Sequence, residues 1–420
     1  MTVPGVSAAA TARPRPDKTR IAFIDIGRAI GALLVVYSHI HVVWMQLDHG
    51  ISAPVTDAVS AAFTSPLHLV GQDLGQLGVP FFFLASGFVV TPIALRQGHA
   101  RFAVNRIFRI YPLLAFAILL AAGAILIGLH PIETVPVGAV TPMTVLTNIT
   151  LVNYVIHPQM VLLGVTWTLA VEVIFYLLLI SLLPVFRRAP WLAIALQLML
   201  IEAVMLTRHE FGPSYAQFAF SMALTTLPII GQIIWAGHTG RLSGWVAAGY
   251  VGVAWWMFVW AKDQEVGHIE AGYPTAVALA ILLFLLGLFG ESHIMQRRAW
   301  TFLSERTYSI YLMHGITVFV VLDALYGRLP LWLAVVLALA VTAGAVEVSY
   351  KLVERPSTVL GRSVARSLRG PGQTVSSRLH FVVCPCRRSG GRHRLRFTKP
   401  GCPRSIHCTD RGTVDVSVPR

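Results

Sequence analysis

The sequence carries little charge, and its cysteines are confined to one end. Asp, Glu, Lys and Arg make up only 12% of the 420 residues, about half of the fraction that is usual in soluble domains. All four cysteines lie at or after Cys384, so the chain before them has neither a disulfide framework nor thiol chemistry. The first 20 residues contain no apolar run typical of a cleavable signal peptide. The shortage of charge argues against a soluble enzyme, and the first apolar run is expected to remain as a membrane span.

What the sequence does have is a series of long apolar segments. Hydrophobic residues make up 55% of the chain, and the mean hydropathy is +0.67. Runs of roughly 20 apolar residues are the length that an α-helix needs to cross a bilayer. Because a helix satisfies its own backbone hydrogen bonds in lipid, we predict an all-α, polytopic membrane helical bundle. About ten spans are expected, at 21–43, 74–95, 110–129, 162–185, 190–207, 215–236, 243–260, 273–290, 300–322 and 330–350.

The distribution of Lys and Arg predicts how these spans are oriented. Basic residues gather in the first 20 positions, in a loop at 96–109 and at 187–188, and such residues favour the cytoplasmic side. Both termini are then cytoplasmic, and the Pro-rich segment 130–161 lies outside. A further crossing at 144–156 would invert every later loop, so only short outer helices or a re-entrant piece are expected there. The sequence thus predicts a multi-pass protein of the inner (plasma) membrane.

Composition divides the chain into three parts. We expect a disordered basic N-terminus at 1–20, a membrane domain at 21–360 and a disordered, Arg-rich tail at 361–420. The net charge is +14, but the basic residues are interpreted as orientation signals and as contacts to anionic lipid, not as a nucleic-acid surface. The Cys and His spacings of the tail match no standard zinc site. No metal is expected in the membrane domain.

Arg28 and His39 are the first candidate site residues. They are eleven positions apart on the first predicted span, so they lie on nearly the same helix face and about 16 Å apart along its axis. Ionisable groups at such depth are costly in lipid and therefore face the protein interior. A neutral histidine can take a proton from a hydroxyl. The alternative is structural, with Arg28 reaching the interface and His39 hydrogen-bonded between helices.

Two further charged motifs accompany this pair. Arg106 and Arg109 lie three residues apart at what we expect to be the start of a helix, a favourable place for a phosphate-bearing ligand. Simple anchoring at the cytoplasmic surface is the alternative. Glu172 lies in the middle of a predicted span, where a carboxylate must be paired or protonated. We expect its partner to be Arg28, His39 or a donor on the ninth span.

Three polar residues complete the candidate set. Ser86 precedes Gly87 in the second span, where a small residue allows neighbouring helices to approach closely. Tyr311 and His314 are three residues apart and share a face of the ninth span. We expect these residues to line the same cavity as the charged groups. Ordinary helix packing is the alternative for each of them.

Six motifs in this order resemble a known family. They are Arg28 with His39 after ten intervening residues, FFFLASGF, Arg106–Arg109 before Ile110-Tyr111-Pro112, WTLAVEVIFY, TYSIYLMH and Glu354-Arg355-Pro356. Together they resemble the bacterial acyltransferase-three family of integral-membrane O-acyltransferases over about residues 20–360. The sequence departs from the family where Ala170-Val171-Glu172-Val173 replaces the usual Ser-Val-Glu-Glu, and where Ala85 replaces a leucine.

The resemblance implies transfer of an acyl group, often acetyl, from acyl-CoA to a hydroxyl of a saccharide or a glycosylated metabolite. The donor is then a co-substrate, and no tightly bound cofactor is expected. His39 is implied as the catalytic base, and Arg106 with Arg109 as the ligands of the CoA phosphates. In the mechanism that we expect, Glu172 orients the base or the acceptor and Arg28 stabilises developing charge or positions the donor.

Ser86, Tyr311 and His314 are expected to bind substrate. A covalent acyl-histidine on His39 is an alternative to direct transfer. A proton-coupled transporter or exporter that uses the buried Arg, His and Glu is the alternative function, although the sequence contains no internal repeat. The identity of the acceptor and the side of the membrane on which it is modified are left open.

Overall fold

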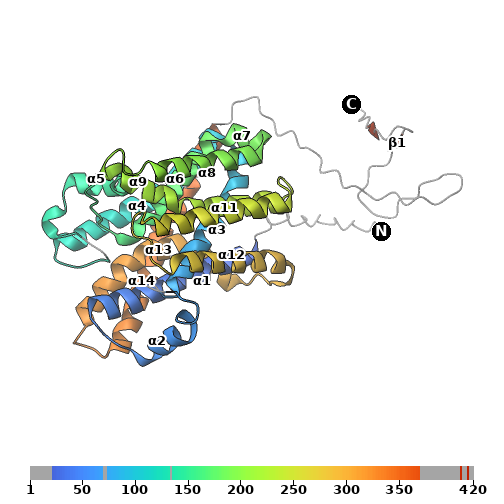
Figure 1. Cartoon of the computed structure of the whole chain (residues 1–420). Helices are drawn as coiled ribbons and strands as arrows, with labels where there is room; N and C mark the ends of the chain where they lie inside the picture. The colour runs from blue at the N-terminus through green and yellow to red at the C-terminus, as the bar shows by residue number, and fades with distance from the viewer. Residues whose placement is uncertain (1–20, 70–72, 133–134, 369–406, 409–413, 416–420) are drawn as a thin grey trace, which may run out of the picture. The chain divides into compact units, whose positions relative to one another are not determined.

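The structure is a computed structural model that describes residues 21–69, 73–132, 135–368, 407–408 and 414–415 (Figure 1). The chain divides into two units, Met1–Gly370 and Pro371–Arg420. In the second unit the described residues form a short antiparallel pair of strands, β1 (His407–Cys408) and β2 (Val414–Asp415).

The described residues of the first unit are helical or lie in turns between helices. The α-helices are α1 (Ala22–Ser38), α2 (Pro54–Val59), α3 (Gly75–Gln97), α4 (His99–Leu126), α5 (Pro142–Thr150), α6 (Trp167–Ser181), α7 (Leu183–Arg188), α8 (Pro190–Leu206), α9 (Pro213–Leu224), α10 (Thr226–His238), α11 (Gly244–Asp263), α12 (Tyr273–Gly290), α13 (Arg298–Leu325), α14 (Leu331–Ser349) and α15 (Arg355–Ser367). Segments of π-helix are η1 (His39–Asp48), η2 (Ser60–Thr64) and η7 (Tyr350–Glu354). Single 3₁₀ turns are η3 (Val137–Ala139), η4 (Val152–Tyr154), η5 (Gly164–Thr166) and η6 (Glu291–His293).

Nine helical segments among the described residues are long and apolar enough to cross a membrane. They cover Ala22–Asp48, Gly75–Gln97, His99–Leu126, Gly164–Ser181, Pro213–His238, Gly244–Asp263, Tyr273–His293, Arg298–Leu325 and Leu331–Ser367. The remaining predicted span, 190–207, corresponds to α8, a shorter apolar helix. The prediction of a polytopic helical membrane bundle is confirmed, while the side on which the termini lie stays a prediction.

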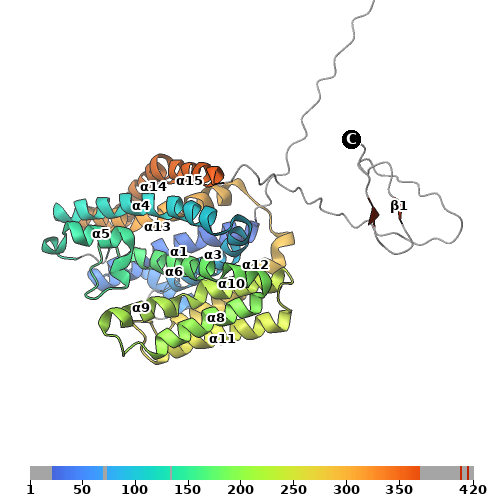
Figure 2. The ribbon, with the colours of Figure 1, turned by 90° about the horizontal axis from the view of Figure 1, so that it is seen from above.

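The α3 helix lies inside the bundle and packs against α1, α10 and α12 (Figure 2). Glycines make these close approaches possible. A β-carbon added at Gly87 would lie 1.8 Å from the backbone oxygen of Pro228, and one added at Gly231 would lie 2.1 Å from that of Leu84. Gly78 approaches the carbonyl of Gly31 on α1 in the same way. Small residues at helix crossings are the usual basis of tight packing in membranes, where apolar side chains gain nothing by leaving lipid.

The α1 helix, which carries the first two candidate residues, is fixed at its start. The carboxylate of Glu291 accepts hydrogen bonds from the backbone N–H groups of Ala22 (2.7 Å) and Phe23 (2.9 Å). Free N–H groups at a helix start need such acceptors, and a negative charge there is favourable. On its side, α1 packs along α13. Large apolar side chains lie on the surface of the bundle, with Trp245 91% and Phe289 78% exposed, as expected for a surface that faces lipid.

The segment between α3 and α4 differs from the predicted basic loop at 96–109. Only Gly98, with a φ angle of 74°, separates the two helices. Because glycine adopts this conformation readily, one residue is sufficient for the turn. Arg106 and Arg109 therefore lie two to three turns inside α4, and the argument from a helix N-terminus does not apply to them.

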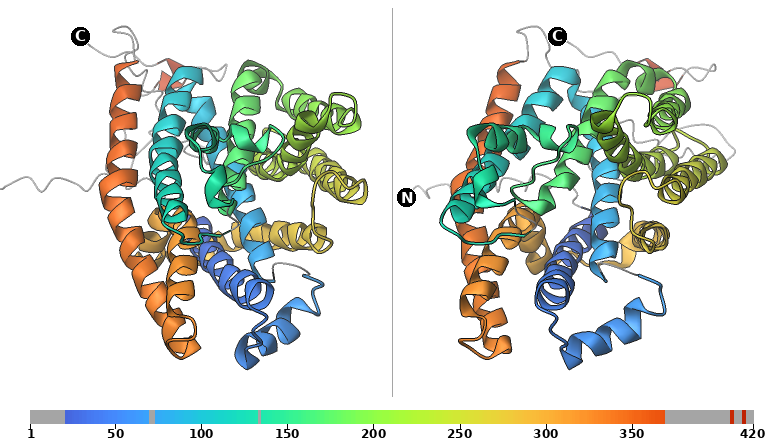
Figure 3. Two further views of the ribbon diagram at one scale, coloured as in Figure 1. Left: turned by 90° about the vertical axis from the view of Figure 1, so that its left-hand side faces the viewer. Right: turned by 60° about the vertical axis from the view of Figure 1, so that its left-hand side comes forward.

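The last span also continues further than predicted. Its helix runs from Leu331 through η7 and α15 to Ser367 (Figure 3), so the boundary predicted at 361 falls inside a helix. The reason is an amphipathic pattern: Gly361 and Ala365 are buried while Arg362 and Arg366 are exposed, and α15 packs on α4. The expectations for 1–20 and for most of the tail fall on residues outside the described ones.

The described residues of the segment 130–161 form only short helices, as predicted, while the side of the membrane on which the segment lies stays a prediction. It holds α5 of nine residues and the turns η3 and η4. A helix of nine residues spans about 14 Å and is too short to cross the apolar core of a bilayer.

Candidate active site

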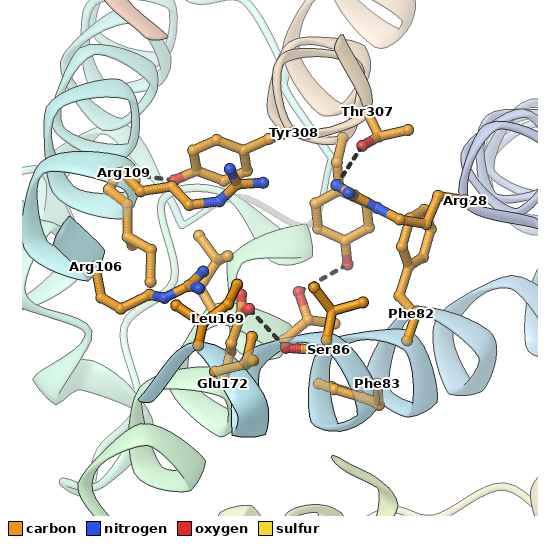
Figure 4. Close-up of a pocket in the computed structure, with 17 residues that line it drawn as sticks. Arg28, Phe82, Phe83, Ser86, Arg106, Arg109, Leu169, Glu172, Thr307 and Tyr308 are labelled. Atoms are coloured by element: carbon orange, nitrogen blue, oxygen red, sulfur yellow. Dashed lines mark hydrogen bonds between the residues drawn. The ribbon is translucent and has the colours of Figure 1, made fainter. Parts of the chain in front are cut away.

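Five helices surround a cavity of about 230 Å³ (Figure 4). We call it the arginine cavity. The groups that line it and carry polar atoms come from α1, α3, α4, α6 and α13, and they are Arg28, Ser86, Arg106, Arg109, Thr168, Glu172, Thr307, Tyr308 and Tyr311. Six of the eight residues predicted from the sequence are thus gathered around one space, although they are spread from position 28 to position 311.

The arginine cavity has an excess of positive charge. Arg106 and Arg109 extend into it from α4, and Arg28 extends into it from the opposite side (Figure 4). Glu172 supplies the one carboxylate of the lining. Guanidinium groups keep their charge in proteins and form paired hydrogen bonds with phosphate oxygens. The cavity is therefore suited to an anionic, phosphate-bearing ligand.

Arg106 is held in place by aromatic rings. Its guanidinium carbon lies 5.2 Å from the ring centres of Phe102 and Tyr176, within the range of cation–π attraction. Its Nε atom is buried and has no hydrogen-bond partner among the described residues. A buried donor without a partner is costly, so a ligand that accepts this hydrogen bond would be stabilised.

Glu172 is paired differently from the expectation. Its Oε1 atom accepts a hydrogen bond from Ser86 (2.9 Å) and a short one from the hydroxyl of Tyr176. These hydrogen bonds come from α3 and from α6 itself and not from the partners expected, Arg28, His39 or a donor on the ninth span, because spacing along one helix does not say which neighbouring helix faces it. Ser86 and Glu172 form one hydrogen-bonded unit in the wall of the arginine cavity.

Arg28 and His39 both contact α13, as a shared helix face requires. The Nη2 atom of Arg28 donates to the hydroxyl of Thr307 (2.8 Å), and Nδ1 of His39 lies 2.8 Å from Nε2 of His314. Thr307 and His314 are seven residues apart, or about two turns of α13. His39 is also the first residue of the π-helical segment η1, a widened turn that often occurs at functional sites.

The two histidines have a defined order of hydrogen bonds. The Nδ1 atom of His314 lies 2.9 Å from the backbone oxygen of Ile310. A carbonyl only accepts, so this nitrogen carries the proton, and Nε2 of a neutral His314 is left to accept. His39 must then donate from Nδ1, which leaves its Nε2 atom unprotonated. The arrangement prepares His39 to accept a proton at Nε2.

His39 lines a different cavity from the arginines. A narrow space of about 30 Å³, which we call the histidine cavity, is bordered by His39 and Tyr311. Tyr311 also lines the arginine cavity, and its hydroxyl accepts a hydrogen bond from Thr168 (3.1 Å). Tyr311 therefore stands where the two cavities meet. His314 is fully buried behind His39, so its position suits it to orient His39 and not to touch a substrate.

Sequence reasoning did not select three residues of this site. Thr307 binds Arg28, Tyr308 donates to the backbone oxygen of Ile110 (2.7 Å), and Tyr176 binds Glu172. Tyr308 and Tyr176 lie inside motifs that were recognised, so the motifs themselves were the available signal. Thr307 is likewise the first residue of the motif TYSIYLMH, but nothing in its sequence position indicates that it binds Arg28. Among the described residues, no group of three or more His, Cys, Asp or Glu side chains is placed to hold a metal ion.

The fold and the site together define a multi-pass membrane enzyme with a buried cationic cavity beside a histidine pair. A family model described as "Acyltransferase domain" matches residues 21–350, and the chain belongs to this family, the acyltransferase-three family of membrane O-acyltransferases. The chain is similar to Nodulation protein 10 of Rhizobium leguminosarum bv. viciae, with 26% identity over 371 residues that cover 82% of this chain and 95% of that protein. No solved structure matches it.

Proposed function

We propose that this membrane O-acyltransferase moves an acyl group, in the first place acetyl, from acyl-CoA to a hydroxyl of a saccharide or a glycosylated metabolite. The observation that carries the proposal is the hydrogen-bond chain from Ile310 through His314 to His39, adjacent to a cavity with three arginines. The arginines suit the phosphates of CoA, and the histidine suits a hydroxyl acceptor. The acyl-CoA is a co-substrate, not a resident cofactor.

The donor occupies the arginine cavity in this proposal. Arg106 and Arg109 bind CoA phosphates, and Arg28, held by Thr307, positions the donor. The thioester then lies toward Tyr311, the residue that this cavity shares with the histidine cavity. The Ser86–Glu172 pair orients the wall against which the acyl-CoA packs.

His39 acts as the general base. Its Nε2 atom takes the proton from the acceptor hydroxyl while that oxygen attacks the thioester carbonyl. The new C–O bond forms, the C–S bond breaks, and the proton passes from His39 to the departing thiolate. The products are an ester and free CoA, and His39 returns to its neutral form. His314 keeps the His39 ring in the required tautomer.

We further propose that the protein lies in the inner (plasma) membrane with the arginine cavity open toward the cytoplasm, where acyl-CoA is made. The support is the positive-inside distribution of basic residues. The family assignment over residues 21–350 favours acyl transfer over the alternative of a proton-coupled transporter.

The test uses membranes that contain the full chain and labelled acetyl-CoA. His39→Ala and His39→Gln are expected to lower transfer by about 100-fold or more, since general-base catalysis contributes about 10²–10⁴-fold. His293→Ala, which changes an exposed histidine of η6, is the matched control. Activity near that of the wild type in both His39 variants would remove His39 from this role.

A further inference from the structure

A second polar cavity lies beyond His39, at the opposite end of α3 from the arginines. Its volume is about 280 Å³, and we call it the glutamate cavity. Gly75, Gln76 and Val79 border it from the first turns of α3, and Trp167 borders it from α6. Glu270, in the connection before α12, and Tyr273, the first residue of α12, complete this part of the lining. None of these residues takes part in the proposed donor site.

The three cavities follow one another along the helices. The histidine cavity shares Gly75, Val79 and Trp167 with the glutamate cavity, and it shares Tyr311 with the arginine cavity. On α3 the residues of the glutamate cavity come first, and the residues that border the arginine cavity, Phe82 onward, come later. His39 therefore lies in a constriction between two larger spaces.

The lining of the glutamate cavity combines hydrogen-bonding groups with aromatic surface. Glu270 accepts a short hydrogen bond from Gln76, and its second carboxylate oxygen has further acceptor capacity. The hydroxyl of Tyr273 is buried without a hydrogen-bond partner among the described residues. Trp167 adds a flat indole beside these groups. Carboxylate and phenol groups bind hydroxyls, and a flat ring packs on the C–H face of a cyclic polyol.

The two volumes set limits on what can enter. A volume of about 280 Å³ lies just below the range of roughly 300–1,000 Å³ for small-molecule sites, which suits one ring and not a polymer chain. The histidine cavity, at about 30 Å³, has room for about one water-sized group. A ring held in the glutamate cavity can thus extend a single hydroxyl toward His39.

We propose that the glutamate cavity is the acceptor subsite and binds one hydroxylated ring of the saccharide class, with a single hydroxyl directed to Nε2 of His39. This inference rests on the proposed function, because it takes the arginine cavity as the donor site. Acylation at one position of the ring follows from the small volume of the histidine cavity, about 30 Å³.

A fourth cavity competes for the same role. It measures about 540 Å³ and is bordered by Asp48, His49, His130 and Asp323. It shares Ile132 alone with the histidine cavity, whereas the glutamate cavity also shares Gly164 in addition to the three residues named above. The more extensive common wall favours the glutamate cavity, and the carboxylate of Asp323 provides a matched control for that of Glu270.

The experiment uses the purified full-length protein, acetyl-CoA and methyl β-glucoside as the acceptor probe, with 1-propanol as an acyclic comparison. Release of free CoA thiol and formation of the acetyl ester are measured. The rate of acetylation of methyl β-glucoside is expected to saturate as its concentration rises, whereas 1-propanol is not expected to be acetylated. Tyr273→Phe and Glu270→Gln are expected to raise the KM for methyl β-glucoside at least tenfold, with the KM for acetyl-CoA unchanged. Asp323→Asn is expected to leave both KM values unchanged.

Several outcomes would overturn the acceptor subsite. One is an unchanged glucoside KM in both Tyr273→Phe and Glu270→Gln. A second is that Asp323→Asn, and neither Tyr273→Phe nor Glu270→Gln, raises the KM for methyl β-glucoside. A third is that protein which binds acetyl-CoA transfers no acetyl group to methyl β-glucoside. Tyr273→Phe removes only a hydroxyl that has no partner, so the test does not depend on how well Glu270→Gln folds. Acetyl-CoA binding that is insensitive to Arg106→Ala would instead count against the proposed donor site, so the two failures are distinguishable.

Discussion

Nδ1 of His39 lies 2.8 Å from Nε2 of His314, and the two rings are nearly parallel, with 11° between their planes. Because His314 is itself anchored to the carbonyl of Ile310, the hydrogen-bond chain has one direction when both rings are neutral. The basic nitrogen of the pair is then Nε2 of His39. The fully buried His314 thus decides which nitrogen of His39 is able to accept a proton.

Removal of His314 is expected to impair catalysis without impairing donor binding. His314→Ala should lower kcat by about 10- to 100-fold, because His39 loses the acceptor that fixes its tautomer, and should leave the KM for acetyl-CoA unchanged. His314→Gln, whose amide oxygen can accept from His39, should recover part of the loss. Steady-state kinetics with labelled acetyl-CoA measures both parameters. A kcat equal to that of the wild type in His314→Ala would contradict the assigned order of hydrogen bonds.

The arginines of α4 are expected to recognise phosphate groups of the donor. For the wild type, 3′-dephospho-acetyl-CoA should show a KM about tenfold or more above that of acetyl-CoA, since a charge-assisted hydrogen bond contributes about 1.5–3 kcal/mol. In Arg106→Ala or in Arg109→Ala this ratio should shrink toward one. Arg366→Ala, on the exposed face of α15, is the control and should keep the wild-type ratio. A ratio that neither variant changes would place the 3′-phosphate elsewhere.

The crossing of α3 and α10 is expected to tolerate no added methyl group. Gly87→Ala puts a β-carbon 1.8 Å from the backbone oxygen of Pro228, so the helices must move apart at a cost of about 1–3 kcal/mol or more. We expect a lower thermal unfolding temperature in detergent. Gly123→Ala, where nothing lies within 4 Å of the new carbon, is the matched change on α4 and should not lower that temperature. Equal unfolding temperatures for the two variants would mean that the helices are less closely packed than described.

Glu270 is expected to make stability depend on pH. Burial raises the pKa of its carboxyl above the ordinary value of 4.5, and the hydrogen bond from Gln76 acts in the opposite direction. The folded protein therefore keeps this proton at pH values at which the unfolded chain has lost it. The contribution of Glu270 to stability is complete below about pH 4.5 and is lost as the pH rises through the raised pKa.

The Glu270→Gln variant should lack this contribution. The unfolding temperature of the wild type, relative to the variant, should be higher near pH 4.5 than near pH 7. Asp263→Asn changes an exposed carboxylate on α11 and should retain the wild-type pH dependence. Parallel curves for the wild type and Glu270→Gln would show that the carboxyl is not buried as described.

Much of the fold was predictable because it depends on local patterns. Apolar length located the spans, and the eleven-residue spacing correctly predicted that Arg28 and His39 share a helix face, which both use to contact α13. The start of α4 was not predictable in the same way, because arginines are compatible with a helix as well as with a loop, and Gly98 alone completes the turn. Helix pairing was the larger obstacle. Glu172 binds Ser86 of α3, and His314 of α13 binds His39. Both contacts depend on how helices that are distant in the sequence pack together, and the spacing of residues within one helix does not reveal this.

The glycine contacts that surround α3 restrict how the enzyme can work. The backbone of α3 is in direct contact with α1 at Gly78 and with α10 at Gly87 and Gly231, and the same helix borders the arginine, histidine and glutamate cavities. A rocking motion of the kind that transporters use would have to separate carbonyl groups that are already in van der Waals contact with these glycines. The close packing therefore opposes a rocking motion of α3 against α1 and α10. In the mechanism proposed above, the two substrates would approach His39 from opposite ends of α3.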